Sequence, residues 1–242
     1  MIRIGLTGSI GMGKSSVSAM FTRLRVPVFD ADAEVHRLQG PGGALVSAIE
    51  ARFPGSTGPN GVDRQKLGPM VLGQPQELRA LERIIHPVVA ATRQRFLQRF
   101  KSRPMIVLDI PLLFEKASKR AARRQVLRQV DVIVTVSAPG WMQVKRVMGR
   151  RGMTAAKFKQ IRRLQVPDRI KRRRADVVIE TGCLRIETYR AVVRLVTCIK
   201  SGKGGYCRND ERNCIRHRNN RAQPSKRRPD GRNWLPRNGQ PG

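Results

Sequence analysis

The residues best suited to chemistry lie near the N-terminus, in the stretch GSIGMGKS from Gly8 to Ser15. This stretch fits G-x-x-x-x-G-K-[ST], the pattern of a phosphate-binding loop. Such a loop holds a phosphate chain with consecutive backbone N–H groups, and glycines line the curve because side chains would obstruct it. The lysine would reach the β- and γ-phosphates, and the serine hydroxyl would ligate Mg²⁺. We therefore predict a nucleoside triphosphate site made by Gly8, Gly11, Met12, Gly13, Lys14, Ser15 and Ser16.

The segments on both sides of the loop support this prediction over a glycine turn with an accidental lysine. The preceding residues, IRIGLT, are typical of a short buried strand. Apolar residues then recur at helical spacing at Val17, Met20, Phe21 and Leu24. A helix that starts at the loop adds its own unpaired N–H groups and its dipole to the anion site.

Two further strands are predicted to end in carboxylates. VPVFDAD (26–32) is an apolar strand that closes on Asp30 and Asp32, and a strand over 105–109 ends at Asp109. Two more apolar strands are predicted over 131–139 and 175–181. Ligands gather at the carboxyl ends of parallel strands, so the loop and the three aspartates can converge on one crevice.

Helical spacing separates these strands. Helices are predicted over 44–53, 63–72, 76–100, 141–149, 153–165 and 184–199, with the long one interrupted at His86-Pro87 and Thr154 as the N-cap of the fifth. Apolar strands that alternate with helices imply an α/β fold with a parallel sheet covered on both faces.

Composition limits the remaining possibilities. The chain has 242 residues and a formal charge of +32. No apolar run approaches ~20 residues, and the first strand begins at once, so we expect neither a membrane span nor a signal peptide, and a cytoplasmic protein. Residues 200–242 carry twelve lysines and arginines against three acids and almost no branched aliphatic side chains. We predict that this tail is disordered and that it binds nucleic acid only non-specifically.

At this point the motifs match a known family. The chain resembles dephospho-coenzyme A kinase in GLTGSIGMGKS, VPVFDAD, LERIIHP, LDIPLLFE and GRRGMTAAKF, followed by QVPDRIKRRRADVVIET. The resemblance covers about residues 1–198. It implies a nucleotide-kinase-like P-loop fold of five parallel strands with helices on both faces, a helical substrate-binding insertion at about 33–100 and a lid at about 146–174. It also implies transfer of the ATP γ-phosphoryl group to the ribose 3′-hydroxyl of dephospho-coenzyme A, with Mg²⁺ as the cofactor. We expect the protein to be a monomer.

The resemblance assigns roles to individual residues. It makes Asp32 the catalytic aspartate, although Asp30 or Asp32 could instead cap the following helix. His86 and Asp109 would contact substrate, and Asp109 could equally be a strand-end hydrogen-bond acceptor. Arg150, or its neighbour Arg151, would bring a lid guanidinium to the phosphates. Glu115 is a weaker candidate, and the basic run at 169–174 is predicted to be mainly a solvated face.

Three features depart from the family pattern. Leu164 occupies the place before the glutamine of QVPD where the family usually has an arginine. Arg25 stands in a turn that usually contains glycine, and it would be strained if that turn needs a positive φ. The segment 115–131 is longer and more basic than usual.

Two alternatives belong to other classes. One is a P-loop kinase for another nucleoside or nucleotide. The other is a non-enzymatic nucleic-acid-binding protein, which 5% aromatic residues disfavour for specific recognition, because single-stranded readers use stacking side chains.

Overall fold

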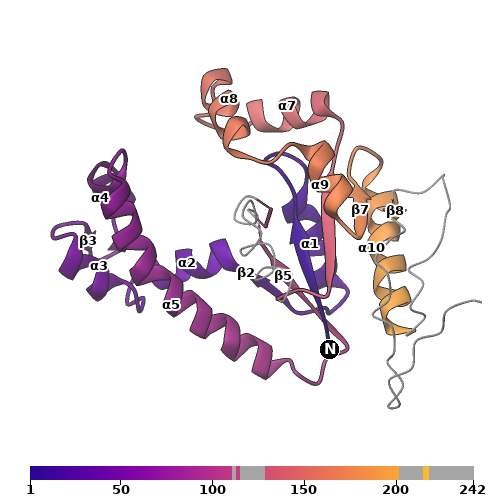
Figure 1. Ribbon diagram of the computed structural model, residues 1–242, viewed down its shortest axis with the longest axis horizontal. Coiled ribbons are helices and arrows are strands. Elements are labelled where there is room, and N and C mark those ends of the chain that lie inside the picture. Colours follow the sequence, from indigo (N-terminus) through magenta and orange to yellow (C-terminus); the bar gives the residue numbers. More distant parts are fainter. Residues whose placement is uncertain (111–112, 115–128, 202–214, 218–242) are drawn as a thin grey trace, which may run out of the picture.

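The computed structural model describes residues 1–110, 113–114, 129–201 and 215–217 (Figure 1). Its centre is a six-stranded sheet in the order β2-β5-β1-β6-β7-β8. The parallel strands are β2 (Val28–Asp30), β5 (Met105–Asp109), β1 (Ile2–Thr7), β6 (Val132–Ser137) and β7 (Val177–Glu180). The predicted five-stranded parallel sheet is confirmed.

Alternate residues of the strands enter two separate cores, as the two-residue period of a strand requires. Ile4, Leu6 and Val134 pack in one cluster with α1 (Lys14–Arg23) and α10 (Arg185–Lys200). On the other face, Ile106, Leu108 and Ile133 form a cluster against which the C-terminal half of α5 (Pro75–Arg99) packs. The central strands are therefore apolar on both sides, which is why they read as continuous apolar runs.

The segment between β2 and β5 forms a lobe of its own, seen beside the sheet in Figure 1. It contains α2 (Ala31–Gln39), α3 (Val46–Arg52), the hairpin of β3 (Thr57–Gly58) and β4 (Gly61–Val62), and α4 (Arg64–Val71). Its own apolar cluster includes Leu45, Ile49, Phe53 and Leu67. The lobe and the sheet are joined by α2 and α5, so α2 leads directly from the edge of the sheet into the lobe.

The predicted interruption of the long helix at His86-Pro87 is wrong. Helix α5 continues from Pro75 to Arg99 with Pro87 inside it. Proline removes one helical hydrogen bond at a cost of about 3 kcal/mol. Apolar residues on both sides of Pro87 offset that cost, because Ile84 and Val88 pack in the lobe and Phe96 packs against the sheet.

The C-terminal part of the fold contains α7 (Gly140–Met148), α8 (Ala155–Leu164) and α9 (Asp168–Arg174). Thr154 is the N-cap of α8, as predicted, and its side chain accepts a hydrogen bond from the Lys157 N–H. The prediction that the whole tail is disordered needs a correction: β8 (Ile215–His217) pairs antiparallel with β7. The backbone of an edge strand offers unpaired groups to any extended segment, which composition does not reveal. The other residues beyond 201 lie outside the described part.

Arg25 has a φ of 57°, and it is the one non-glycine residue with a positive φ in the described ranges. It follows α1, where the Val26 N–H bonds to the Phe21 carbonyl at 3.1 Å and the Arg25 N–H to the Thr22 carbonyl at 2.9 Å. This is the Schellman ending of a helix, whose left-handed position normally holds glycine. The turn does require a positive φ, which is the condition under which the sequence predicted strain at Arg25.

Replacement of Arg25 by glycine is expected to raise the free energy of unfolding by about 1 kcal/mol. Glycine relieves the left-handed strain, and part of that gain is lost to the greater entropy of the unfolded chain. Urea denaturation measures the change. Arg25→Ala is the matched control, since alanine keeps the strain, and a gain of the same size in Arg25→Ala would contradict the explanation.

Candidate active site

Three of the predicted site segments meet at the carboxyl edge of the sheet. Asp109, the last residue of β5, lies in register with Leu6 of β1 on one side and with Asp30 of β2 on the other. Neighbouring strands are about 4.8 Å apart. The phosphate-binding loop begins at Gly8, directly after β1, and residues 30–32 (Asp-Ala-Asp, the DAD segment) follow β2. The loop and the DAD segment therefore flank Asp109, as the sequence predicted.

The loop itself has the backbone that its glycines suggest. Gly11 and Gly13 have φ angles of 76° and 89°. A Cβ atom at Gly11 would lie 2.5 Å from a methyl group of Val147, and one at Gly13 would lie 2.8 Å from the Thr181 hydroxyl. Both positions therefore exclude a side chain twice over, by conformation and by close approach. Ser15 and Ser16 are exposed in the first turn of α1, which begins at Lys14.

Four polar residues that sequence reasoning missed support the loop. The Gln143 amide donates to the Ile10 carbonyl at 2.8 Å, and Arg146 donates to the Thr181 carbonyl at 2.7 Å and to the Gly11 carbonyl at 3.4 Å. The Thr181 hydroxyl donates to the Met12 carbonyl at 2.7 Å. The side-chain oxygen Oε1 of Gln165 accepts from the Ile10 N–H at 3.1 Å. These residues come from α7, the end of α8 and the end of β7, so only tertiary structure could reveal them.

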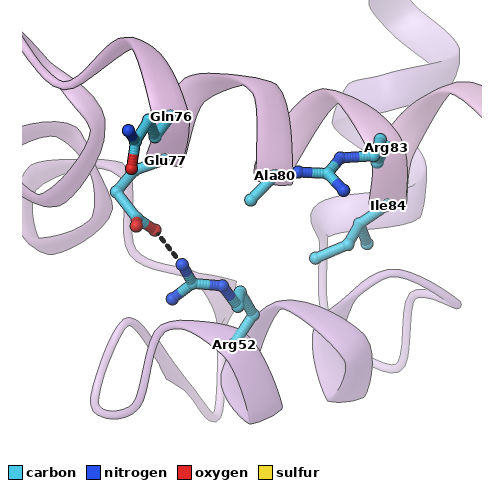
Figure 2. Close-up of a pocket in the computed structure, with 6 residues that line it drawn as sticks. All are labelled: Arg52, Gln76, Glu77, Ala80, Arg83 and Ile84. Carbon is cyan, nitrogen blue, oxygen red and sulfur yellow. Dashed lines mark ion pairs between the residues drawn. The ribbon is translucent and has the colours of Figure 1, made fainter.

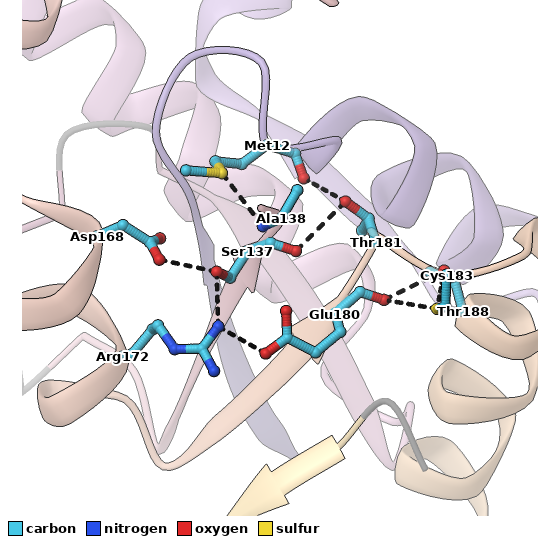
Figure 3. Close-up of polar contacts among 9 residues, drawn as sticks. All are labelled: Met12, Ser137, Ala138, Asp168, Arg172, Glu180, Thr181, Cys183 and Thr188. Atoms are coloured by element: carbon cyan, nitrogen blue, oxygen red, sulfur yellow. Dashed lines mark hydrogen bonds and ion pairs between the residues drawn. The ribbon is translucent and has the colours of Figure 1, made fainter. Parts of the chain in front are cut away.

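The basic run at 169–174 is not mainly a solvated face, so that prediction is wrong. Lys171 is fully buried. Figure 3 shows Arg172 donating to the Ser137 hydroxyl at 2.8 Å and pairing with Glu180 at 2.5 Å. Ser137 in turn donates to Asp168 at 2.8 Å. Helix α9 is thereby attached to the carboxyl ends of β6 and β7, next to Ala138, whose N–H donates to the Met12 sulfur of the loop at 3.2 Å.

Lys14 and Asp109 form a salt bridge at the centre of the site. The Asp109 side chain is 1% exposed, and its second oxygen, Oδ2, is buried without a hydrogen-bond partner among the described residues. Burial raises the pKa of Asp109, Lys14 opposes that rise, and the charges of Asp30 and Asp32 add to it. Asp30 and Asp32 are therefore close enough to act on Asp109 electrostatically.

The two aspartates of the DAD segment occupy different positions. Asp30 is the N-cap of α2, and its carboxylate accepts from the N–H groups of Asp32 and Ala33, both at 3.0 Å. Asp32 lies in the first turn of α2, and its side chain is exposed. The capping function that the sequence left open between them thus belongs to Asp30, which leaves the Asp32 carboxylate available for other contacts.

The remaining predicted residues are less constrained. His86 is exposed in the middle of α5. Arg150 and Arg151 are exposed in the turn after α7, and neither side chain makes a salt bridge within the described ranges. Leu164 is 76% exposed at the end of α8, so it is not a core residue. Glu115 lies outside the described residues.

A Mg²⁺ ion needs hard oxygen ligands, often one or two from the protein together with phosphate oxygens and water. The site offers the Ser15 hydroxyl at the start of α1 and the buried, unpartnered Oδ2 of Asp109. The described part of the chain holds no group of three or more His, Cys, Asp or Glu residues that could ligate a metal ion. This set fits an ion held largely by the nucleotide and poorly fits an all-protein metal cage.

A phosphate-binding loop after the first strand, the strand order of the parallel sheet and the lobe between β2 and β5 define a P-loop kinase. The sequence model of dephospho-CoA kinase matches residues 2–184, and the chain belongs to that family.

Individual relatives agree with this assignment. The chain is 52% identical to dephospho-CoA kinase of Novosphingobium aromaticivorans, over 81% of this chain and 94% of the relative. It is 47% identical to dephospho-CoA kinase of Zymomonas mobilis, over 84% and 99% of the two chains. The fold, considered alone, is also that of the solved structure of dephospho-CoA kinase from Campylobacter jejuni, which superposes with a TM-score of 0.60 at 20% identity, over 83% of this chain and 98% of that one. No helix among the described residues is long and apolar enough to cross a membrane.

Proposed function

We propose that this protein transfers the γ-phosphoryl group of ATP to the ribose 3′-hydroxyl of dephospho-coenzyme A, giving coenzyme A and ADP. The single observation that carries the proposal is the register of β1, β5 and β2. It brings the phosphate-binding loop and the carboxylates of the DAD segment to the two sides of Asp109. A phosphate donor and a hydroxyl acceptor have to meet in this way for direct transfer.

In this proposal Asp32 acts on the acceptor. A carboxylate that accepts a hydrogen bond from the 3′-hydroxyl aims the hydroxyl oxygen at the γ-phosphorus and takes its proton. The new P–O bond forms as the bond from the γ-phosphorus to the β–γ bridging oxygen breaks, and ADP leaves with that oxygen. The exposed position of Asp32 in the first turn of α2 supports this role. The Asp30 carboxylate instead accepts hydrogen bonds as the N-cap of α2. His86 and Asp109 stay predictions for contact with the substrates.

Charge neutralisation is assigned to Lys14 and Arg150. Lys14 would exchange its partner Asp109 for the β- and γ-phosphates when nucleotide enters, and Arg150 would approach the transferring group as the lid closes. Gly8, Gly11, Met12, Gly13, Ser15 and Ser16 would hold the phosphate chain through the backbone and the first turn of α1. Mg²⁺, held by Ser15 and the phosphates, would neutralise charge on the phosphate oxygens.

Cytoplasmic location and a monomeric state stay predictions from the sequence.

An acceptor-specificity assay tests the proposed function. The full chain, ATP and Mg²⁺ are incubated with dephospho-coenzyme A, adenosine, AMP or shikimate, and phosphorylated product is measured. We expect kcat/KM to be highest for dephospho-coenzyme A by a factor of 100 or more. Faster transfer to another acceptor, or none to dephospho-coenzyme A, would overturn the proposal.

Leu164→Arg is expected to raise kcat/KM about threefold or more without loss of stability, if the arginine usual in the family helps to hold ATP. The exposure of Leu164 means that the fold should tolerate the change. Arg163→Ala should then lower kcat/KM more in the parent than in the Leu164→Arg background. Steady-state kinetics on the four proteins measures both effects, and an unchanged kcat/KM in Leu164→Arg would show that the departure is harmless.

A further inference from the structure

Two backbone carbonyls of the phosphate-binding loop are held by side chains from distant elements. The Ile10 carbonyl accepts a hydrogen bond from the Gln143 amide of α7 at 2.8 Å. The Met12 carbonyl accepts one at 2.7 Å from the hydroxyl of Thr181, the residue that follows β7, as Figure 3 shows. The loop is therefore bonded through alternate carbonyls to two parts of the fold that lie outside it.

The two donors are themselves fixed in place. The side chains of Gln143 and Thr181 are buried. Thr181 is bonded further by Arg146, which donates to its hydroxyl oxygen at 3.0 Å and to its backbone carbonyl at 2.7 Å. Since buried side chains with bonded polar atoms keep one rotamer, the donors set the direction of the loop carbonyls.

The direction of a carbonyl also decides the direction of the next N–H group. A trans peptide group is planar, and its C=O and N–H bonds point in opposite directions. The carbonyl of Ile10 shares its peptide group with the N–H of Gly11, and the carbonyl of Met12 shares its group with the N–H of Gly13. Holding the two carbonyls therefore turns the N–H groups of the two glycines to the opposite side of the loop.

These glycine N–H groups are available to a ligand, whereas their neighbours are not. The Ile10 N–H donates to Oε1 of Gln165 at 3.1 Å, and the Met12 N–H donates to the Ser9 carbonyl at 3.1 Å. Within the described part of the chain, the N–H groups of the two glycines donate to no other group. An anion in the loop can therefore be bound by the same N–H groups whose peptide groups are oriented by the buried side chains.

We propose that Gln143 and Thr181 are positioning residues for the phosphate chain of ATP. They hold two carbonyls on the outer side of the loop, so that the N–H groups of Gly11 and Gly13 point to the phosphates before the nucleotide enters. Donors oriented in advance do not have to reorganise when the anion binds. The inference rests on the proposed function in taking ATP as the ligand, and neither side chain needs to touch the nucleotide.

Two substitutions of Thr181 separate the effect of its hydroxyl from that of its shape. Valine keeps the shape and removes the hydroxyl, whereas serine keeps the hydroxyl. Calorimetry of ATP binding to the full chain should give a Kd at least about tenfold higher for Thr181→Val than for the parent. The Kd of Thr181→Ser should stay within about threefold of the parent.

Gln143→Met gives an independent test from another element of the fold. Methionine has a similar length and no donor, so the Kd for ATP should rise by a similar factor. Gln39→Met is the buried control, because the Gln39 side chain bonds to Arg64 in the lobe between β2 and β5. Gln76→Met is the exposed control, at the pocket between α3 and α5 in Figure 2. Both controls should bind ATP as the parent does.

Inorganic triphosphate and adenosine separate phosphate positioning from a general loosening of the site. In Thr181→Val and Gln143→Met the affinity for triphosphate should fall by the same factor as that for ATP. The inhibition constant of adenosine should not change, because adenosine has no phosphate. In steady-state kinetics the KM for ATP should rise by a larger factor than kcat falls. The melting temperature checks the fold, and either variant tests the inference if the other unfolds.

The outcomes distinguish this inference from the proposed function. An unchanged Kd for ATP in both variants, an equal loss in Thr181→Ser or Gln39→Met, or an equal loss of adenosine binding would each overturn the positioning role. If the variants lose triphosphate affinity as expected but the parent does not phosphorylate dephospho-coenzyme A, the proposed function is overturned and the positioning role stands.

Discussion

Replacement of Lys14 by alanine is expected to lower kcat by on the order of 10³-fold and to weaken ATP binding. Lys14 lies at the end of the loop, at the carboxyl edge of the sheet, where it pairs with Asp109. Its loss removes the positive charge where negative charge accumulates on the transferring phosphoryl group. Stopped-flow measurement of transfer and calorimetry with a non-hydrolysable ATP analogue report the two effects separately.

The same variant is expected to change how stability depends on pH. Lys14 opposes the rise that burial causes in the pKa of Asp109, so without Lys14 the pKa of that carboxyl rises further. A carboxyl whose pKa is higher in the folded protein than in the unfolded chain binds its proton more tightly when folded. The variant should therefore lose stability as the pH rises through that pKa, by about 3 kcal/mol relative to the parent at pH 8 and by less at pH 5.

Urea denaturation at pH 5 and pH 8 measures this dependence, and a second substitution separates its cause. Lys14→Ala/Asp109→Asn removes the buried charge as well, so it should recover most of the stability at pH 8 but none of the activity. Lys145→Ala, an exposed lysine on α7, serves as the control for loss of a charge. Normal turnover in Lys14→Ala would mean that the loop is only structural.

Asp32→Asn is expected to lower kcat by on the order of 10²-fold or more while ATP binds nearly as well as to the parent. The amide keeps the shape of the side chain and loses the basicity needed to take the proton of the 3′-hydroxyl. The KM for dephospho-coenzyme A should change much less than kcat. An acceptor analogue that lacks the 3′-hydroxyl should bind the parent and receive no phosphate.

Asp30 provides the matched comparison, because it is two residues away and caps α2. Asparagine is as good an N-cap as aspartate, so Asp30→Asn should keep both stability and most of the turnover, whereas Asp30→Ala should lose about 1 kcal/mol of stability. If Asp30→Asn is inactive and Asp32→Asn is active, the two roles are reversed. If both asparagine variants turn over normally, the mechanism has to be rebuilt around Asp109.

The sequence alone determined the parts of this protein that depend on short-range patterns. The glycine spacing of 8–13 predicted the loop, because a left-handed backbone and close approach both require glycine at fixed positions. The apolar runs predicted the five parallel strands, because strands covered on both faces have no polar side. The sequence also marks Arg25 as a departure from a turn that usually holds glycine, but only the φ of 57° shows that this position is left-handed.

Tertiary structure decided what depends on contacts between distant segments. Four residues that lie far from the loop in the sequence hydrogen-bond to its backbone: Gln143, Arg146, Gln165 and Thr181. The local sequence around a polar residue does not show which distant group it will bond. Packing on both sides of Pro87 kept α5 continuous against its local propensity. The division of tasks between Asp30 and Asp32 was open in the sequence, because either carboxylate can cap a helix. The backbone path at the start of α2 gave the cap to Asp30, since its oxygen alone reaches the N–H groups of Asp32 and Ala33.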